Sequence, residues 1–198
     1  MKILIDEDIL EFLKVCYFGS DENPYKASSN RAYRDLNRTI RFNGMEQNAR
    51  DKLRDEVHTL LEKEIKSVCN SNITTQEQFD VWHKKTCDKI RELYKNKNIT
   101  FSFGQAQKWI NMTFKYLYIL QICDFEDIFM FLHVPLDNYV MEIAEKEFAV
   151  KRLSTPWSRC DDYKQYIAYQ NELRANIDNC EPLRWEFSSW IKALKDSN

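Results

Sequence analysis

The stretch from Trp109 to Cys123 constrains the fold more than any other part of the chain, because its residues are apolar or aromatic around most of a helical circumference. A helix of this kind is normally surrounded by other helices. Ser102 and Gln105 are spaced as in a capping box, which predicts that the helix begins at this point. The sequence therefore indicates a central helix enclosed by others.

One narrow polar stripe runs along this predicted helix. Charge occurs in it only at Lys108 and Lys115, which are seven residues apart and so share one face. Gln105 and Asn111 flank that face. Two interpretations stay open: the stripe faces solvent, or it forms the wall of a site.

The scarcity of glycine and proline favours an all-α fold. The chain of 198 residues has only 3 glycines and 4 prolines, whereas sheets joined by tight turns need more of both. Apolar residues recur at helical spacing on both sides of the central stretch, which predicts a two-lobed multi-helix bundle of eight to nine helices. The expected helical segments are residues 6–18, 24–42, 47–69, 75–94, 102–123, 124–132, a segment after Asp137, 161–176 and a segment after Glu181.

We interpret residues 1–198 as a single all-helical domain, long enough to bury a sizeable core. The polar run at 95–98 (KNKN) is the best candidate for a boundary between two lobes, 1–95 and 99–198, with room for a cleft between them. Thr155, Pro156 and Trp157 predict a further capped helix start with proline in the first turn.

The bulk charge excludes a generally basic nucleic-acid-binding protein. The formal net charge is -2, so a nucleic-acid partner would need a local basic patch. The chain has no glycine-rich phosphate loop, dinucleotide fingerprint or zinc-type spacing, and we expect neither a cofactor nor a metal. The six dispersed cysteines fit reduced core residues of a cytoplasmic protein, and no uncharged run is long enough to span a membrane.

Four arginines recur at steps of three, four and three residues, which places them along one face of the helix expected at 24–42. They are Arg31, Arg34, Arg38 and Arg41. A solvated amphipathic face accounts for this pattern. A phosphate-contacting strip is the other explanation, because the guanidinium fork matches phosphate geometry.

Two segments resemble the helix-hairpin-helix DNA glycosylases, most closely the divergent archaeal oxoguanine type. They are residues 103–112 (FGQAQKWINM) and 133–140 (HVPLDNYV), within a similar region of about 101–148. In that superfamily a lysine opens the helix after the hairpin, and a proline-apolar-aspartate step heading a later helix supplies a catalytic aspartate. The resemblance gives these roles to Lys108 and Asp137. Ser102, Phe103 and Gly104 stand where the family has its glycine-rich hairpin.

The resemblance implies an all-helical, two-lobed fold with a cleft into which a modified base is flipped, as base-directed chemistry in a duplex requires. We expect Gly104, Gln105 and Lys115 to contact nucleic acid together with the four arginines. Trp157, Tyr163 and Tyr166 are candidates for the walls of a base pocket, because aromatic faces stack on bases. Packing in the core is the other explanation for these three rings.

Lys108 and Asp137 also make a chemically plausible pair without the family. A lysine becomes a nucleophile when its amine is deprotonated, and a carboxylate at a helix N-terminus stays ionised and can stabilise a developing sugar cation. In the structural alternative Lys108 is solvated and Asp137 only caps its helix. The lone helical histidines His58 and His83 are expected to be packed or surface residues.

Two functions follow from these patterns. The first is a DNA base-excision enzyme that cleaves the N-glycosidic bond, with or without strand cleavage through a Schiff base on Lys108. Its partner would be duplex DNA with a modified base. The second is a non-catalytic helical interaction or regulatory module, of the kind found in defence systems, whose partner would be a protein. The negative net charge favours the second function, whereas the arginine row and the lysine–aspartate pair favour the first.

Overall fold

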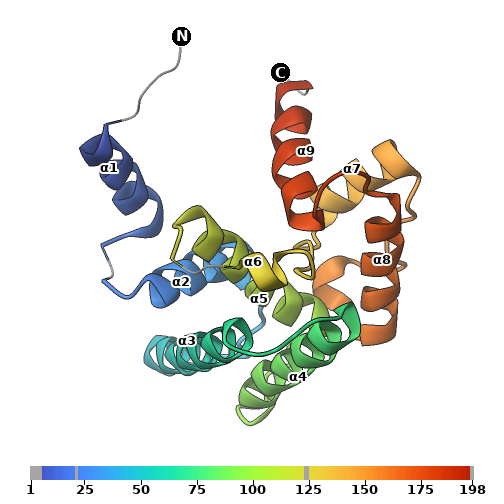
Figure 1. Cartoon of the computed structure of the whole chain (residues 1–198). Coiled ribbons are helices and arrows are strands. Elements are labelled where there is room, and N and C mark those ends of the chain that lie inside the picture. Colours follow the sequence, from blue (N-terminus) through green and yellow to red (C-terminus); the bar gives the residue numbers. More distant parts are fainter. Residues whose placement is uncertain (1–5, 21, 123–124, 197–198) are drawn as a thin grey trace.

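A computed structural model of the chain describes residues 6–20, 22–122 and 125–196 (Figure 1). Helices account for 72% of the structure, and the described residues contain no strand, which confirms the predicted all-α bundle. The helices found in these ranges are α1 (Glu7–Phe18), α2 (Pro24–Leu36), α3 (Gln47–Cys69), α4 (Gln76–Lys95), α5 (Phe103–Ile119), α6 (Glu126–Phe129), α7 (Asn138–Phe148), α8 (Tyr163–Asn176) and α9 (Pro182–Asp196), with the 3-10 turns η1 (Asn37–Thr39) and η2 (Trp157–Arg159).

Helix α5 lies at the centre of the molecule, as predicted. The Ser102 side chain accepts a hydrogen bond from the Gln105 backbone while the Gln105 side chain accepts one from the Ser102 backbone, so the capping box is confirmed. All but three residues of α5 are buried. The helix contacts α2, α4, α8 and η2, and Figure 1 shows it surrounded by elements from both halves of the chain.

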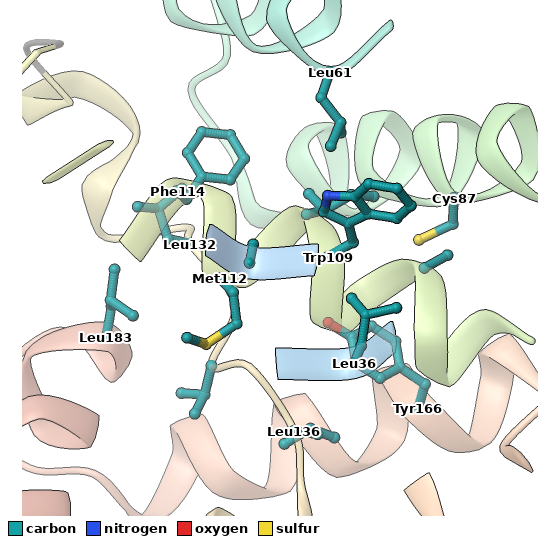
Figure 2. Close-up of a cluster of buried hydrophobic side chains, with 14 of the residues drawn as sticks. Leu36, Leu61, Cys87, Trp109, Met112, Phe114, Leu132, Leu136, Tyr166 and Leu183 are labelled. Carbon is teal, nitrogen blue, oxygen red and sulfur yellow. The ribbon is translucent and has the colours of Figure 1, made fainter. Parts of the chain in front are cut away.

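The buried apolar side chains form one continuous cluster that extends from Phe18 to Trp185. Trp109 is completely buried, and its indole nitrogen donates to the Ser29 carbonyl at 3.0 Å. Figure 2 shows Trp109 and Phe114 extending from one side of α5, while Met112 extends from the other. The central helix therefore packs its large side chains in opposite directions.

The start of α5 touches the backbone of η2. The Gly104 N–H donates to the Cys160 carbonyl at 2.9 Å. A Cβ atom on Gly104 would lie only 1.6 Å from the Trp157 carbonyl oxygen, a distance that no side chain can occupy. This contact fixes Trp157 beside the first turn of α5.

Four predicted helical segments are shorter in the structure, and the one expected at 102–123 ends at Ile119. The helix expected at 24–42 ends at Leu36 and continues as η1, because Gln105 donates to the Thr39 carbonyl at 2.9 Å and holds this turn against α5. The helix expected at 124–132 is limited to the four residues of α6, and residues 123–124 lie outside the described part. The capped start predicted at Thr155 is only the turn η2, which has no side-chain cap.

None of the helices in the described ranges is long and apolar enough to cross a membrane.

Candidate functional site

A cavity of about 850 Å³ opens between the N-terminal helices α1 and α2, the central helix α5, and the C-terminal helices α7 and α9. Its walls combine aromatic side chains with eight charged ones. The charged residues are Arg31, Arg34, Asp35, Arg38, Lys108, Lys115, Asp137 and Glu186. The aromatic residues are Tyr17, Tyr116, Tyr139, Trp157, Phe187 and Trp190.

Lys108 and Asp137 meet in this cavity. The Lys108 Nζ atom lies 2.7 Å from Asp137 Oδ2, and only 6% of the Lys108 side chain is exposed. The other carboxylate oxygen, Oδ1, accepts from the Val140 N–H at 2.8 Å and so caps α7. Asp137 therefore binds the lysine and caps the helix at once, and 29% of its side chain remains accessible.

The polar stripe of α5 forms a wall of the cavity. Lys108, Met112, Lys115 and Ile119 recur at helical spacing and all line the cavity. The Lys115 ammonium contacts both oxygens of Glu186, at 2.7 and 2.6 Å, and that carboxylate is buried. The stripe therefore lines a cavity and does not face open solvent.

A cluster of polar side chains joins α1 to α2 and α5 at one edge of the cavity. The Arg31 guanidinium donates to Asp35 at 2.8 Å and to the Tyr17 hydroxyl at 3.0 Å. The Tyr116 hydroxyl donates to the second oxygen of Asp35 at 2.6 Å. Burial and the neighbouring Asp35 carboxylate raise the pKa of Tyr116 far above its ordinary value, so this hydroxyl stays a donor.

Three of the four predicted arginines line the cavity: Arg31, Arg34 and Arg38. Arg41 lies beyond η1 and does not. Arg34 and Arg38 are exposed, and neither forms an ion pair with another described residue.

The lining contains five basic and three acidic side chains, which gives a formal charge of about +2. The whole chain carries -2. The cavity is thus a local basic patch on an acidic protein.

Comparisons with protein-family models, with curated proteins and with solved structures find no similar protein. Among the described residues, no three His, Cys, Asp or Glu side chains are grouped in a way that could hold a metal ion. The chemistry available in the cavity is that of the Lys108–Asp137 pair and the side chains around it.

Of the three aromatic residues predicted for a base pocket, only Trp157 lines the cavity. Tyr163 and Tyr166 lie on the far side of α5, where the Tyr166 hydroxyl accepts from Asn111 at 3.0 Å and the Tyr163 hydroxyl contacts His83 at 3.0 Å. Tyr166 is buried in the core and Tyr163 packs against the core with its side chain partly buried, so neither ring lines the cavity.

Gly104 and Gln105 are buried and therefore offer no surface to nucleic acid, unlike what we expected. Gly104 is needed for the close contact with η2, and the Gln105 amide is occupied by Ser102 and Thr39. Lys115 does line the cavity, but Glu186 occupies its ammonium group.

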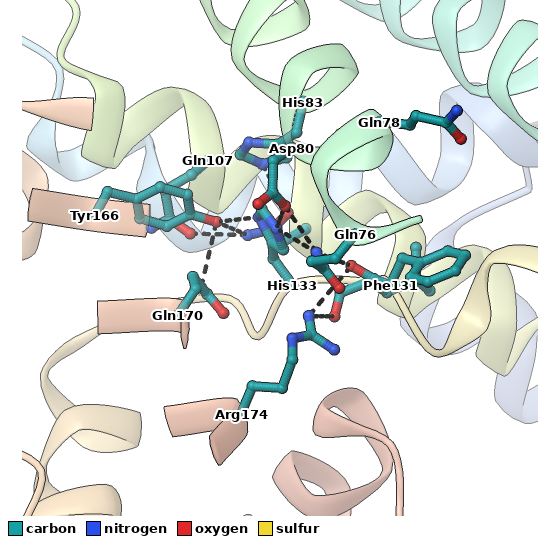
Figure 3. Close-up of polar contacts among 12 residues, drawn as sticks. Gln76, Gln78, Asp80, His83, Gln107, Phe131, His133, Tyr166, Gln170 and Arg174 are labelled. Carbon is teal, nitrogen blue, oxygen red and sulfur yellow. Dashed lines mark hydrogen bonds and ion pairs between the residues drawn. The ribbon is translucent and has the colours of Figure 1, made fainter. Parts of the chain in front are cut away.

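A buried polar network behind the cavity was not predicted from the sequence (Figure 3). His83 and His133 have ring centroids 4.5 Å apart, and His133 contacts Asp80 at 2.8 Å. Burial lowers the pKa of both histidines, and for His83 the neighbouring His133 lowers it further. His83 is thus packed, as expected, but in a polar environment that helical spacing alone does not reveal.

Proposed function

We propose that the chain is a DNA base-excision enzyme in which Lys108 is the nucleophile and Asp137 assists it. The observation that carries this proposal is the 2.7 Å contact between the two side chains in a cavity of about 850 Å³. Such a volume falls in the range of about 300–1,000 Å³ that small-molecule sites have, so a flipped nucleotide has space there.

The proposed reaction begins when Lys108 transfers a proton to the Asp137 carboxylate, its nearest acceptor. The free amine then attacks C1′ of the nucleotide. The N-glycosidic bond breaks, and the base leaves with the bonding electron pair and takes up the proton that Asp137 holds, which restores the carboxylate. The attached nitrogen of Lys108 then gives a proton to the ring oxygen as the C1′–O4′ bond breaks, and an imine between that nitrogen and C1′ results. The restored carboxylate stabilises the positive charge of this protonated imine.

The rim of the cavity supports DNA as the substrate. Arg34 and Arg38 are exposed and carry no ion pair among the described residues, so they are available to phosphates. Trp157 and Trp190 supply aromatic faces within the same cavity. An extruded nucleotide needs both features, because its phosphates bind cationic side chains and its base stacks on aromatic rings.

Borohydride trapping on a duplex with one abasic site tests the proposal without knowledge of the base. The aldehyde of that site condenses with a lysine amine, water is lost, and borohydride reduces the imine to a stable link. We expect a covalent protein–DNA species in the wild type, with Lys108 identified as the linked residue by peptide mass spectrometry. Lys108→Gln should abolish the species.

Asp137→Asn keeps the helix cap, since Asn caps a helix about as well as Asp, but it removes the negative charge. We expect it to slow trapping by about 10²-fold or more, the range typical of a lost acid–base group. Lys164→Gln, on the exposed surface of α8, is the matched control and should trap at the wild-type rate. Undiminished trapping by Lys108→Gln would contradict the proposal.

Helix α1 favours a second function, association with a protein. Large apolar side chains are exposed along it, and only Phe18 is buried. The exposed ones are Ile9, Leu10, Phe12, Leu13, Val15 and Tyr17. Monomeric proteins seldom leave such a surface uncovered. Sedimentation equilibrium of the wild type and of Phe12→Asp separates the cases: a wild-type dimer that the variant loses would assign α1 to self-association.

A further inference from the structure

The buried segment at 132–136 leads directly into Asp137, and it belongs to no helix or strand. Buried backbone N–H and C=O groups must find hydrogen-bond partners, and helices and sheets normally supply them. Here side chains of the neighbouring helices take that role, among them those of Gln107, Gln170 and Arg174.

Two glutamines bind this segment in the same way. The Leu136 N–H donates to Gln107 Oε1 at 3.2 Å, and Gln107 Nε2 donates to the Leu136 carbonyl at 3.0 Å. The Val134 N–H donates to Gln170 Oε1 at 3.2 Å, and Gln170 Nε2 donates to the Val134 carbonyl at 2.7 Å. Pro135 lies between them and has no N–H to satisfy. Each glutamine amide therefore makes the two backbone hydrogen bonds that a residue of a neighbouring strand would make in a sheet.

The orientation of the Gln107 amide is fixed on both sides. Its Oε1 atom also accepts from Asn111 Nδ2 at 3.0 Å, and its Nε2 atom also donates to the Gly104 carbonyl at 2.9 Å. The amide thus accepts two hydrogen bonds and donates two, which satisfies its full capacity. If the amide were flipped, its NH2 group would face the Leu136 N–H and the Asn111 NH2 group, which are both donors. Only one orientation of the amide therefore fits.

Gln107 links the chain segments that carry the two members of the reacting pair. It is adjacent to Lys108 on α5, and it holds Leu136, which is adjacent to Asp137. We propose that Gln107 is a positioning residue that sets the separation between Lys108 and Asp137. This inference rests on the proposed function, in which the pair carries out proton transfer. A misplacement of about 1 Å can slow such a step by about 10²-fold.

Gln170 provides a matched control. It makes the same pair of hydrogen bonds to Val134, three residues before Asp137, and its side chain is equally buried. Substitution of either glutamine by Met keeps the shape of the side chain and removes both bonds to the segment, together with the other hydrogen bonds of that amide. If both glutamines are only structural, the two variants should lose stability and trapping rate to the same extent. If Gln107 positions the pair, only Gln107→Met should slow trapping strongly.

The experiment compares Gln107→Met and Gln170→Met on the abasic duplex under single-turnover conditions, with the dissociation constant measured by fluorescence anisotropy. We expect Gln107→Met to slow trapping by about 10- to 100-fold with an unchanged dissociation constant. Gln170→Met should trap within about twofold of the wild type at a similar loss of melting temperature. Equal rates in the two variants would overturn the inference.

A second measurement does not depend on activity. Acetylation of Lys108 by an amine-reactive ester, followed by mass spectrometry, reports how firmly the amine is held. Acetylation should be slow in the wild type and in Gln170→Met, and several-fold faster in Gln107→Met. If the wild type fails to trap but acetylation follows this order, the proposed reaction is wrong and the positioning role stands. If acetylation is the same in all three proteins, the positioning role is wrong.

Discussion

Single residues can be irreplaceable for steric reasons, and Gly104 is the clearest case in this chain. It lies inside α5, where alanine would normally stabilise the helix by about 1 kcal/mol relative to glycine. A Cβ atom at this position would lie 1.6 Å from the Trp157 carbonyl oxygen and 2.8 Å from its carbon. Because both are backbone atoms, no rotation of a side chain can relieve the clash.

We expect Gly104→Ala to destabilise the protein by more than about 3 kcal/mol, above the usual cost of overpacking. Gly44→Ala is the comparison, since Gly44 has a φ of +84° with no neighbouring atom within 4 Å. Its cost should be about 1–2 kcal/mol, from backbone strain alone. Urea denaturation of both variants measures the difference, and a stabilised Gly104→Ala would contradict the close packing of α5 on η2.

Individual site residues were predictable where a local pattern marked them. Asp137 follows a proline–leucine step and caps the next helix, and the structure places it against Lys108 although 29 residues separate the two. Tyr163 and Tyr166 were indistinguishable from cavity residues in the sequence, because helical spacing gives the faces of a helix but not the side of the molecule that each face meets. Only the packing of α8 on α5 decides that Tyr166 is buried and that Tyr163 packs, partly buried, against the core.

At the scale of helices, caps and tertiary contacts determine where each one ends. The starts of α5 and α7 were predicted correctly because a side chain within the same segment caps each of them. The end of α2 was not, because the Gln105 side chain that holds η1 lies 66 residues away from Thr39. Local sequence cannot contain that information.

The turn η1 after α2 separates Arg41 from the other three arginines. Arg31, Arg34 and Arg38 line the cavity, whereas Arg41 lies past η1. If duplex DNA binds at this rim, Arg34→Ala and Arg38→Ala should each reduce the slope of log binding constant against log salt by about 0.9, the value for one phosphate contact. Arg41→Ala is the matched control and should leave the slope unchanged. Binding titrations at several salt concentrations give these slopes, and equal effects in all three variants would show that the cavity rim is not the contact surface.

On the scale of the whole molecule, the polar network behind the cavity connects α4, α5, α8 and the segment before α7. The Tyr166 hydroxyl lies at its centre, within 2.9 Å of His133 Nδ1 and 3.0 Å of Asn111 Nδ2. His83 Nε2 contacts Asn111 Oδ1 at 3.1 Å, which extends the network from α4 to α5. The network therefore holds together helices that are distant in sequence. Burial lowers the pKa of both histidines, which favours their uncharged forms.

These lowered pKa values predict a loss of stability in mild acid. An unfolded histidine binds a proton below about pH 6.5, whereas the buried pair resists protonation until lower pH. As the pH falls below about 6.5, the unfolded state therefore binds more protons than the folded state. The free energy of unfolding is highest above about pH 6.5 and decreases as the pH falls toward the pKa values of the folded histidines. The slope of the free energy of unfolding against pH should approach about 1.4 kcal/mol per pH unit for each histidine.

Asp80 contacts His133, and its pKa is lowered because hydrogen bonds from His133 and Gln76 outweigh the opposing effect of burial. Its own contribution is therefore lost only near or below about pH 4, outside the window of the histidines. His83→Gln keeps a donor for Asn111 but removes one titrating group, so it should roughly halve the slope of unfolding free energy between about pH 5 and about pH 6.5. Urea denaturation across this range measures the slope. An unchanged slope in the variant would show that His83 is protonated to the same extent in the folded and unfolded chains, and that the network holds a charged histidine.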